Sequence, residues 1–126
     1  MSQLMFQKTF TPQEANLRLP LVRSIVNDIL EKGKAYQVAL EKDEDIQISH
    51  QALHRREKIQ ELIAELEALG CFYKDWNFEV GLVDFPSVIH GEEVFLCWRP
   101  DEPKVQWYHG IAEGYSGRKP IPEEML

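Results

Sequence analysis

The sequence predicts an α+β fold in which a long helical hairpin packs on a small antiparallel meander of three to four strands. Apolar residues recur every three to four positions up to Gly70, which is the period of an amphipathic helix. After Gly70 the period becomes two, in short runs rich in valine and aromatic residues that are typical of strands. We expect residues 1–126 to form one domain, with the hairpin at 11–70, the sheet at 71–110 and a Gly/Pro-rich loop and tail at 111–126.

The start of the first helix is marked by residues 11–14, which read T-P-Q-E. The threonine is placed to cap the helix, the proline occupies the first helical position, and the glutamate completes a capping box. Pro20 breaks the pattern, because a proline inside a helix removes a hydrogen bond and clashes with the preceding turn. We therefore expect a short turn over 12–18 and a kink, followed by a long helix from about residue 20 to residue 43.

Both predicted helices carry an apolar stripe. The first stripe consists of Val22, Ile25, Val26, Ile29, Leu30, Gly33, Tyr36 and Leu40. The second helix is expected over 50–69, with Ser49 as its cap and Gly70 just after its end. Its stripe consists of Ala52, Leu53, Ile59, Leu62, Ile63, Leu66 and Leu69. The acidic stretch 41–45 between the helices is expected to be the turn of an αα-hairpin.

Four β-type runs follow Gly70. They cover residues 71–75, 82–87, 93–99 and 105–109. The intervening segments 89–92 and 100–103 have the composition of hairpin turns, which predicts a meander. Pro86 has no N–H to give to a ladder, so we expect it at a sheet edge or a strand end. Residues 4–10, before the first helix, are expected as a short strand or an extended lead-in that packs Phe6 and Phe10.

Composition and charge narrow the range of partners. The net charge is −7, and residues 71–126 carry five basic against ten acidic side chains. Nucleic-acid binding needs a basic stripe, and the nearest candidate is Arg55 and Arg56, next to Glu57. An RNA-associated role therefore rests on those two arginines alone, and we expect neither a nucleic acid nor a membrane as partner.

The N-terminal residues have no apolar signal region, and no apolar run approaches the length of a membrane span. The expected compartment is the cytoplasm. In that compartment Cys71 and Cys97 are expected to be reduced and buried.

Several blocks of the C-terminal half carry a resemblance. They read GLVDFPS at 81–87, LCWRPDE at 96–102, WYHG at 107–110 and GYSGR at 114–118. Together with TPQEAN and LPLV before the long helix, they resemble a family of small bacterial proteins, the domain of unknown function numbered 2203. The family has no assigned activity, so the resemblance implies no catalytic residue. It marks Asp84, Cys97, Trp98, Arg99, Trp107, His109, Gly114 and Arg118 as signature-like positions.

A candidate binding site follows from the alternation of side chains along the strands. If the meander aligns its strands, Asp84, Arg99 and His109 converge near one rim of the sheet, with Arg118 nearby. A carboxylate, a guanidinium and an imidazole together would orient a polar ligand or support acid–base chemistry at neutral pH. The simpler interpretation is an Asp84–Arg99 ion pair that fixes the strand register, with His109 satisfied at a strand end.

Three other groupings are weaker. Asp84, Cys97 and His109 are side chains that zinc accepts, but each comes from a separate strand, so we expect no metal and no cofactor. His50 and His54 have the spacing of two ligands on one helical face but are expected to be exposed. The Gly-rich loop 110–119 is expected to be a structural turn, with an anion site as the alternative.

The first functional hypothesis is a non-enzymatic binding or assembly module, and no residue is assigned a catalytic role. Its helices would pair with another copy to give a homo-oligomer, and its sheet rim at Asp84, Arg99, His109 and Arg118 would take a small anionic ligand or a protein partner. The alternative is a small hydrolase or transferase that uses His109 as base and Asp84 to orient it, with or without a metal.

Overall fold

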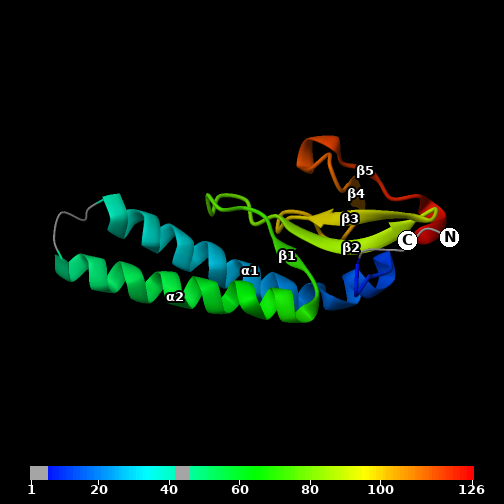
Figure 1. Cartoon of the computed structure of the whole chain (residues 1–126). Helices are drawn as coiled ribbons and strands as arrows, with labels where there is room; N and C mark the ends of the chain where they lie inside the picture. The colour runs from blue at the N-terminus through cyan, green and yellow to red at the C-terminus, as the bar shows by residue number, and fades with distance from the viewer. Residues whose placement is uncertain (1–5, 42–45) are drawn as a thin grey trace.

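Two long helices and five short strands make up the computed structural model, which describes residues 6–41 and 46–126. The helices are α1 (Pro12–Glu41) and α2 (Ile46–Leu69). The strands are β1 (Phe72–Tyr73), β2 (Val83–Ile89), β3 (Glu92–Trp98), β4 (Trp107–Gly110) and β5 (Lys119–Pro120), with 3₁₀ turns at Tyr115–Gly117 and Glu123–Met125. Neighbouring strands are antiparallel in the order β1-β2-β3-β4-β5 (Figure 1). The α+β class, the helical hairpin and the meander are confirmed.

The predicted capping box starts α1, but the predicted division into a short turn over 12–18 and a separate long helix from about residue 20 is wrong. The Thr11 N–H donates to Glu14 Oε1 at 2.9 Å, and the Glu14 N–H donates to Thr11 Oγ1 at 3.1 Å. The helix then continues through Pro20 to Glu41. Pro20 is exposed, whereas Leu19 and Val22 on either side of it are buried. The packing of these apolar neighbours holds the helix in place despite the missing hydrogen bond.

The α2 helix begins four residues earlier than predicted, at Ile46, so Ser49 lies inside the helix and is not its cap. Residues 46–49 include neither glycine nor proline, so their composition allows the helix to start before residue 50. The end agrees with the prediction. Gly70 adopts φ +99°, its N–H donates to the Glu67 carbonyl, and the Cys71 N–H donates to the Leu66 carbonyl. The expected turn at 41–45 falls, beyond Glu41, outside the described residues.

The turn predicted at 89–92 is confirmed as a two-residue hairpin between β2 and β3. Ile89 pairs with Glu92, and the two residues between them, His90 and Gly91, have φ +52° and +81°. Positive φ at both positions is the type I′ geometry that matches the twist of the strands.

Pro86 lies in the middle of β2, which corrects the expectation of an edge or strand-end position. Its carbonyl points away from β3 and accepts the Phe10 N–H at 2.7 Å, so its nitrogen also points away from the β3 ladder. β1 pairs only with Asp84 and Val83 on this edge of β2. At Pro86 the hydrogen-bond partner on the same edge is Phe10, in the segment before α1. A central proline therefore costs the sheet no ladder hydrogen bond.

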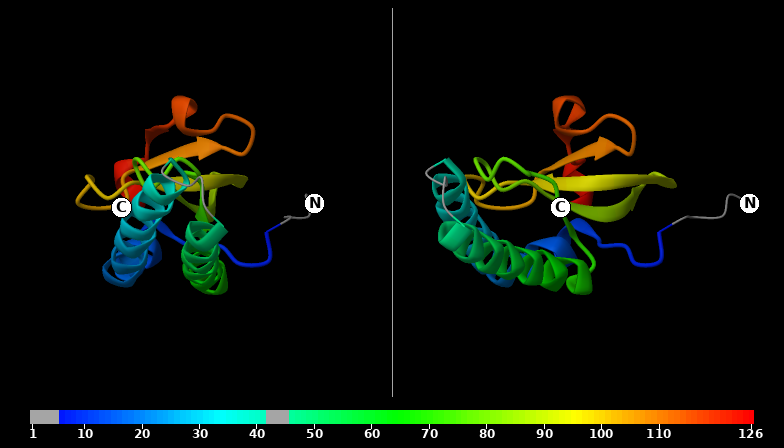
Figure 2. Two further views of the ribbon diagram at one scale, coloured as in Figure 1. Left: turned by 90° about the vertical axis from the view of Figure 1, so that its left-hand side faces the viewer. Right: turned by 60° about the vertical axis from the view of Figure 1, so that its left-hand side comes forward.

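The two faces of the sheet are covered by different parts of the chain. Figure 2 shows the helix pair against one face and the segment after β4 over the other. Side chains of β2 and β3 that face the helices join Val22, Val26 and Ile29 of α1 in the apolar core. Those facing the helices are Val83, Phe85, Ile89, Val94, Leu96 and Trp98. The opposite face, called the far face below, carries Asp84, Cys97 and His109.

The far end of the helical hairpin projects beyond the sheet (Figure 1). Leu40 and Leu53, both predicted in the apolar stripes, are 47% and 52% exposed, and Val38 is 48% exposed. These stripe residues are not buried as the pattern predicts, because the sheet does not extend to this end of the hairpin. Only the other helix is available to cover them. Neither helix in the part of the chain that the structure describes is long and apolar enough to cross a membrane.

The tail is more ordered than the predicted irregular loop. Lys119 and Pro120 form β5, which pairs with Tyr108 and Trp107 and brings the sheet to five strands. Ile121 is 3% exposed, and its N–H donates to the Gln106 carbonyl at 2.9 Å. The buried side chain of Ile121 therefore anchors this segment, although the segment's composition is typical of a loop.

Candidate functional site

Three chemically active side chains meet on the far face of the sheet. Asp84 in β2 lies directly across from Cys97 in β3, and His109 in β4 lies across from Phe95, one row further along β3. Asp84, Cys97 and His109 are 5%, 1% and 3% exposed. One ligand-type atom from each residue lies within 4.8 Å of the others. We call these residues the far-face triad.

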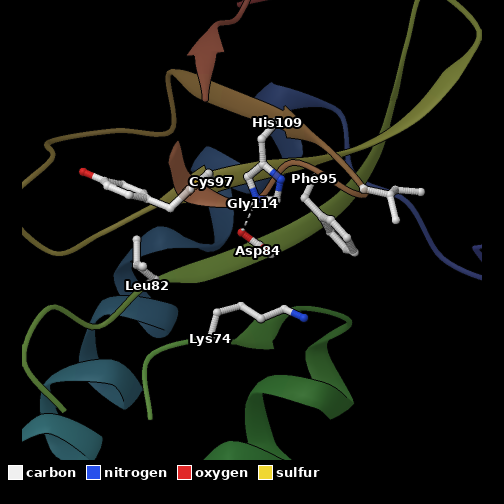
Figure 3. Close-up of a pocket in the computed structure, with 9 residues that line it drawn as sticks. Lys74, Leu82, Asp84, Phe95, Cys97, His109 and Gly114 are labelled. Carbon is white, nitrogen blue, oxygen red and sulfur yellow. Dashed lines mark hydrogen bonds and ion pairs between the residues drawn. The ribbon is translucent and has the colours of Figure 1, made fainter. Parts of the chain in front are cut away.

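Asp84 and His109 form a buried pair (Figure 3). His109 Nε2 lies 3.1 Å from Asp84 Oδ1, and His109 Nδ1 lies 2.8 Å from the carbonyl oxygen of Gly110. A carbonyl can only accept, so Nδ1 carries a proton. One further proton is then shared between Nε2 and the carboxylate. Burial raises the pKa of Asp84, and the charge of His109 opposes that rise.

Cys97 completes the triad as a neutral thiol. Burial is the main reason that its pKa rises to about 12, and the negative charge of Asp84 adds to the rise. The predicted burial of the cysteines is confirmed for both Cys97 and Cys71, which are not joined in a disulfide. A thiol held neutral in this way is a poor nucleophile on its own.

A pocket of about 290 Å³ opens over the triad. Its remaining walls are Lys74, Leu82, Phe95, Ile111, Gly114 and Tyr115. Figure 3 shows Asp84 and His109 turned toward each other, with Lys74 across the pocket from His109. The Lys74 Nζ lies 5.5 Å from the centre of the Phe95 ring and 5.8 Å from that of Phe72. The pocket therefore combines a polar floor, apolar sides and one ammonium group.

The two predicted arginines lie beside the pocket and contact Tyr115, which lines it. Arg99 donates to the Tyr115 hydroxyl at 2.6 Å, and its Nε lies 2.7 Å from Asp101 Oδ1 without the angle of a hydrogen bond. The guanidinium carbon of Arg118 lies 4.9 Å from the ring centres of both Trp107 and Tyr115. The structure thus brings Asp84 and His109 together and places the two arginines in a neighbouring cluster.

Arg118 connects this cluster to the triad. It donates to the Cys97 carbonyl at 3.2 Å and pairs with Glu102 at 2.9 Å, where both side chains are 13% exposed. Arg99 pairs with Asp101 rather than with Asp84, so the expected register-fixing ion pair is replaced by the Asp84–His109 contact. The arginines hold the loop after β4 over the far face.

Lys74 and Tyr115 are pocket residues that sequence reasoning missed. Lys74 is two residues after Phe72, which lies across from Asp84, so the period of two places it on the far face. That signal is usable only when the register of β1 against β2 is known. Tyr115 belongs to the loop after β4. Strand periodicity does not predict which way a side chain in a loop points.

The remaining sequence candidates form no binding site of their own, although the Gly-rich loop lines the pocket through Ile111, Gly114 and Tyr115. In the Gly-rich loop 110–119, the Glu113 side chain lies against Gly110 and Gly117, so the loop's own carboxylate fills the space expected for an anion. Lys119 Nζ lies 3.7 Å from the same carboxylate. His50 and His54 are both exposed on α2, as predicted.

The structure thus defines an α+β protein, with a helical hairpin on an antiparallel meander and a buried carboxylate–imidazole pair under a small pocket. The chain belongs to the family of uncharacterized conserved proteins DUF2203, whose sequence model matches residues 8–121. This confirms the resemblance drawn from the sequence blocks. Searches of curated proteins and of solved structures found no significant match.

Proposed function

We propose that this protein is a binding module whose pocket over the far-face triad takes a small molecule with an acidic group and a short apolar body. The observation that carries the proposal is the pocket itself, in which one ammonium group faces apolar walls and a buried polar floor. Its volume of about 290 Å³ suits a ligand at the small end of those bound by proteins.

The charges in the pocket favour an anion. The Asp84–His109 pair shares one proton and is neutral as a unit, and the Cys97 thiol is also neutral. Lys74 then leaves the pocket with one positive charge at its mouth. A carboxylate or phosphate oxygen near Lys74 Nζ would gain a charge-assisted hydrogen bond, with the rest of the ligand against Leu82 and Ile111.

The hydrogen bonds of His109 favour binding over general-base catalysis. A catalytic imidazole offers one nitrogen to the substrate while the other is oriented by a carboxylate. Here the nitrogen opposite Asp84 is bonded to the Gly110 carbonyl, so neither ring nitrogen is open to a substrate proton. The alternative of a hydrolase or transferase would require His109 to leave one of these partners.

The test measures the thermal unfolding midpoint of metal-free protein with acetate, benzoate or inorganic phosphate. Benzoate combines a carboxylate with an apolar body, so we expect it to raise the midpoint more than acetate does. In Lys74→Ala the shift with benzoate is expected to disappear. Lys104→Ala is the matched control, because it removes the same charge from an exposed lysine that does not line this pocket, and it should keep the shift.

A benzoate shift that is equally large in Lys74→Ala and Lys104→Ala would contradict the proposed pocket. Absence of any shift with all three anions would contradict the choice of an anionic ligand.

A second candidate function, self-association through the helices, is favoured by the projecting end of the hairpin. Val38, Leu40 and Leu53 are each about half exposed there, and pairing with a second copy would remove apolar surface from water. Size-exclusion chromatography with light scattering tests it at tens of micromolar protein. A mass of one chain would contradict self-association, whereas a mass of two that falls in Leu40→Glu/Leu53→Glu would support it.

A further inference from the structure

We infer that Asp84, Cys97 and His109 form a zinc site at the floor of the pocket, with three protein ligands and a fourth position open to the pocket. The inference deepens the proposed function and rests on it in one respect, namely that the pocket is a site where a ligand binds. The ligand atoms would be Asp84 Oδ1, Cys97 Sγ and His109 Nε2.

The spacing of the three side chains is close to that of a zinc tetrahedron. Zinc–oxygen, zinc–nitrogen and zinc–sulfur bonds of about 2.0 to 2.3 Å place neighbouring ligand atoms about 3.3 to 3.8 Å apart. His109 Nε2 and Asp84 Oδ1 are 3.1 Å apart, and all three ligand atoms lie within 4.8 Å of one another. Small side-chain rotations bring such atoms to bonding distance without a change in the strands.

The neighbours of the triad orient it for a metal. In metal sites a ligating histidine commonly gives its other N–H to a carbonyl or carboxylate, which fixes the ring and the tautomer. His109 Nδ1 does this with the Gly110 carbonyl and leaves Nε2 directed at Asp84. Arg118 binds the Cys97 carbonyl and steadies the middle strand of the site. Three adjacent strands supply the three ligands, so their relative positions are fixed by the sheet.

The donor set favours zinc over magnesium and calcium. A thiolate, an imidazole and a carboxylate together suit zinc, while magnesium and calcium prefer oxygen ligands alone. Three protein ligands leave one position for water or for a ligand in the pocket, as in zinc sites that bind small molecules. An acidic group at that position would also lie in the same pocket as the Lys74 ammonium group.

Charge balance limits the penalty for burying an ion. Zn²⁺ would displace the proton held between His109 Nε2 and Asp84 Oδ1 and the thiol proton of Cys97, and both protons would leave to water. One carboxylate and one thiolate then balance the two charges of the ion, so the loaded site has no net charge.

The experiment uses cobalt as a spectroscopic substitute for zinc. Full-length protein is stripped with a chelator, dialysed and titrated with Co²⁺ while absorption is recorded. A thiolate ligand gives a charge-transfer band in the near ultraviolet, and a tetrahedral site gives strong visible bands. We expect both bands to saturate at one cobalt per chain and to disappear when Zn²⁺ is added.

Two serine variants separate the site from other thiols. Cys97→Ser should lose the charge-transfer band, whereas Cys71→Ser should keep it, because Cys71 is buried elsewhere and lies against the Leu66 carbonyl. Asp84→Asn and His109→Gln should each weaken cobalt binding at least about tenfold. Circular dichroism verifies that each variant is folded. No band in the wild type, or a band retained in Cys97→Ser, would overturn the inference.

The two proposals fail in different ways. If benzoate stabilises the metal-free protein and no cobalt band forms, the zinc inference fails and the anion pocket stands. If the cobalt band forms but no anion shifts the unfolding midpoint of metal-free or zinc-loaded protein, the proposed ligand class fails and the metal site stands.

Discussion

The two faces of the sheet both contain fully buried side chains, but these side chains are chemically opposite. Among the side chains of β2 and β3 that point to the helices, Val83, Phe85, Leu96 and Trp98 are apolar and 0% exposed. On the far face, the loop after β4 covers Asp84, Cys97 and His109, which are at most 5% exposed. Apolar burial stabilises a fold directly, whereas a buried ion pair rarely stabilises more than an apolar pair of the same size. We therefore expect that an apolar pair could replace the polar groups of the far face at little cost to the stability of the fold.

The largest expected effect is on the helix-facing side. Phe85→Ala removes a ring that packs edge-on against Phe10, with 5.5 Å between centroids, and leaves a cavity in the core. We expect it to lower the free energy of unfolding by about 3 to 5 kcal/mol, measured by urea denaturation of metal-free protein. Ile111→Ala is the control, because Ile111 is 53% exposed at the pocket, and its loss should cost less than about 0.5 kcal/mol.

The Asp84–His109 pair tests whether the far face is retained for stability. Asp84→Val alone leaves His109 buried without its partner, and we expect a loss of about 3 kcal/mol in the free energy of unfolding. Asp84→Val combined with His109→Leu removes both polar groups. We expect the double variant to lie within about 1 kcal/mol of the wild type and to lose its response to benzoate and cobalt.

Urea denaturation of both variants measures this difference. A double variant as unstable as the single one would show that the polar pair stabilises the fold more than an apolar pair does. The proposed difference between the two faces would then be wrong.

A smaller effect distinguishes two carboxylates in the sheet half. Burial raises the pKa of Asp84. For Asp75, burial also acts to raise the pKa, but the N–H groups of Gly81, Val80, Asn77 and Glu79 outweigh it and lower the pKa below its ordinary value. These bonds shape the loop that leads to β2.

A lowered folded-state pKa means that Asp75 stabilises the fold above its unfolded pKa of about 3.9 and loses that contribution as the pH falls through the folded value. We expect Asp75→Asn to cost about 1.5 kcal/mol at neutral pH, and the difference from wild type to vanish in acid. Denaturation curves at several pH values measure it. Asp101→Asn is the control with an exposed carboxylate, and an equal pH dependence in both variants would contradict this assignment.

Local signals in the sequence predicted those helix ends and turns that neighbouring residues decide. The capping box at Thr11, the αL glycine at Gly70 and the turn at His90–Gly91 depend on neighbouring residues, so they could be identified without the fold. The errors arose where distant contacts decide. Pro20 stays helical because its neighbours are buried, and Ile121 anchors the tail because a place in the core exists for it.

The candidate site was predictable in part. Alternation along the strands placed Asp84 and His109 on a common face in an aligned meander, and the structure brings them to 3.1 Å. Alternation also predicted that Arg99 lies near Asp84 and His109. In the structure Arg99 follows the end of β3, and its side chain contacts Asp101 and Tyr115 instead. Lys74 and Tyr115 could not be placed, because their positions depend on the β1–β2 register and on a loop.

The sequence by itself determined the class of the fold, since the change from a period of 3.6 to a period of 2 at Gly70 follows from the steric rules of helix and strand. Only the tertiary structure decided that Asp84, Cys97 and His109 share one buried floor beneath Lys74. The physical reason is that strand register and loop cover are fixed by packing between residues far apart in the chain, and a local pattern carries no record of that packing.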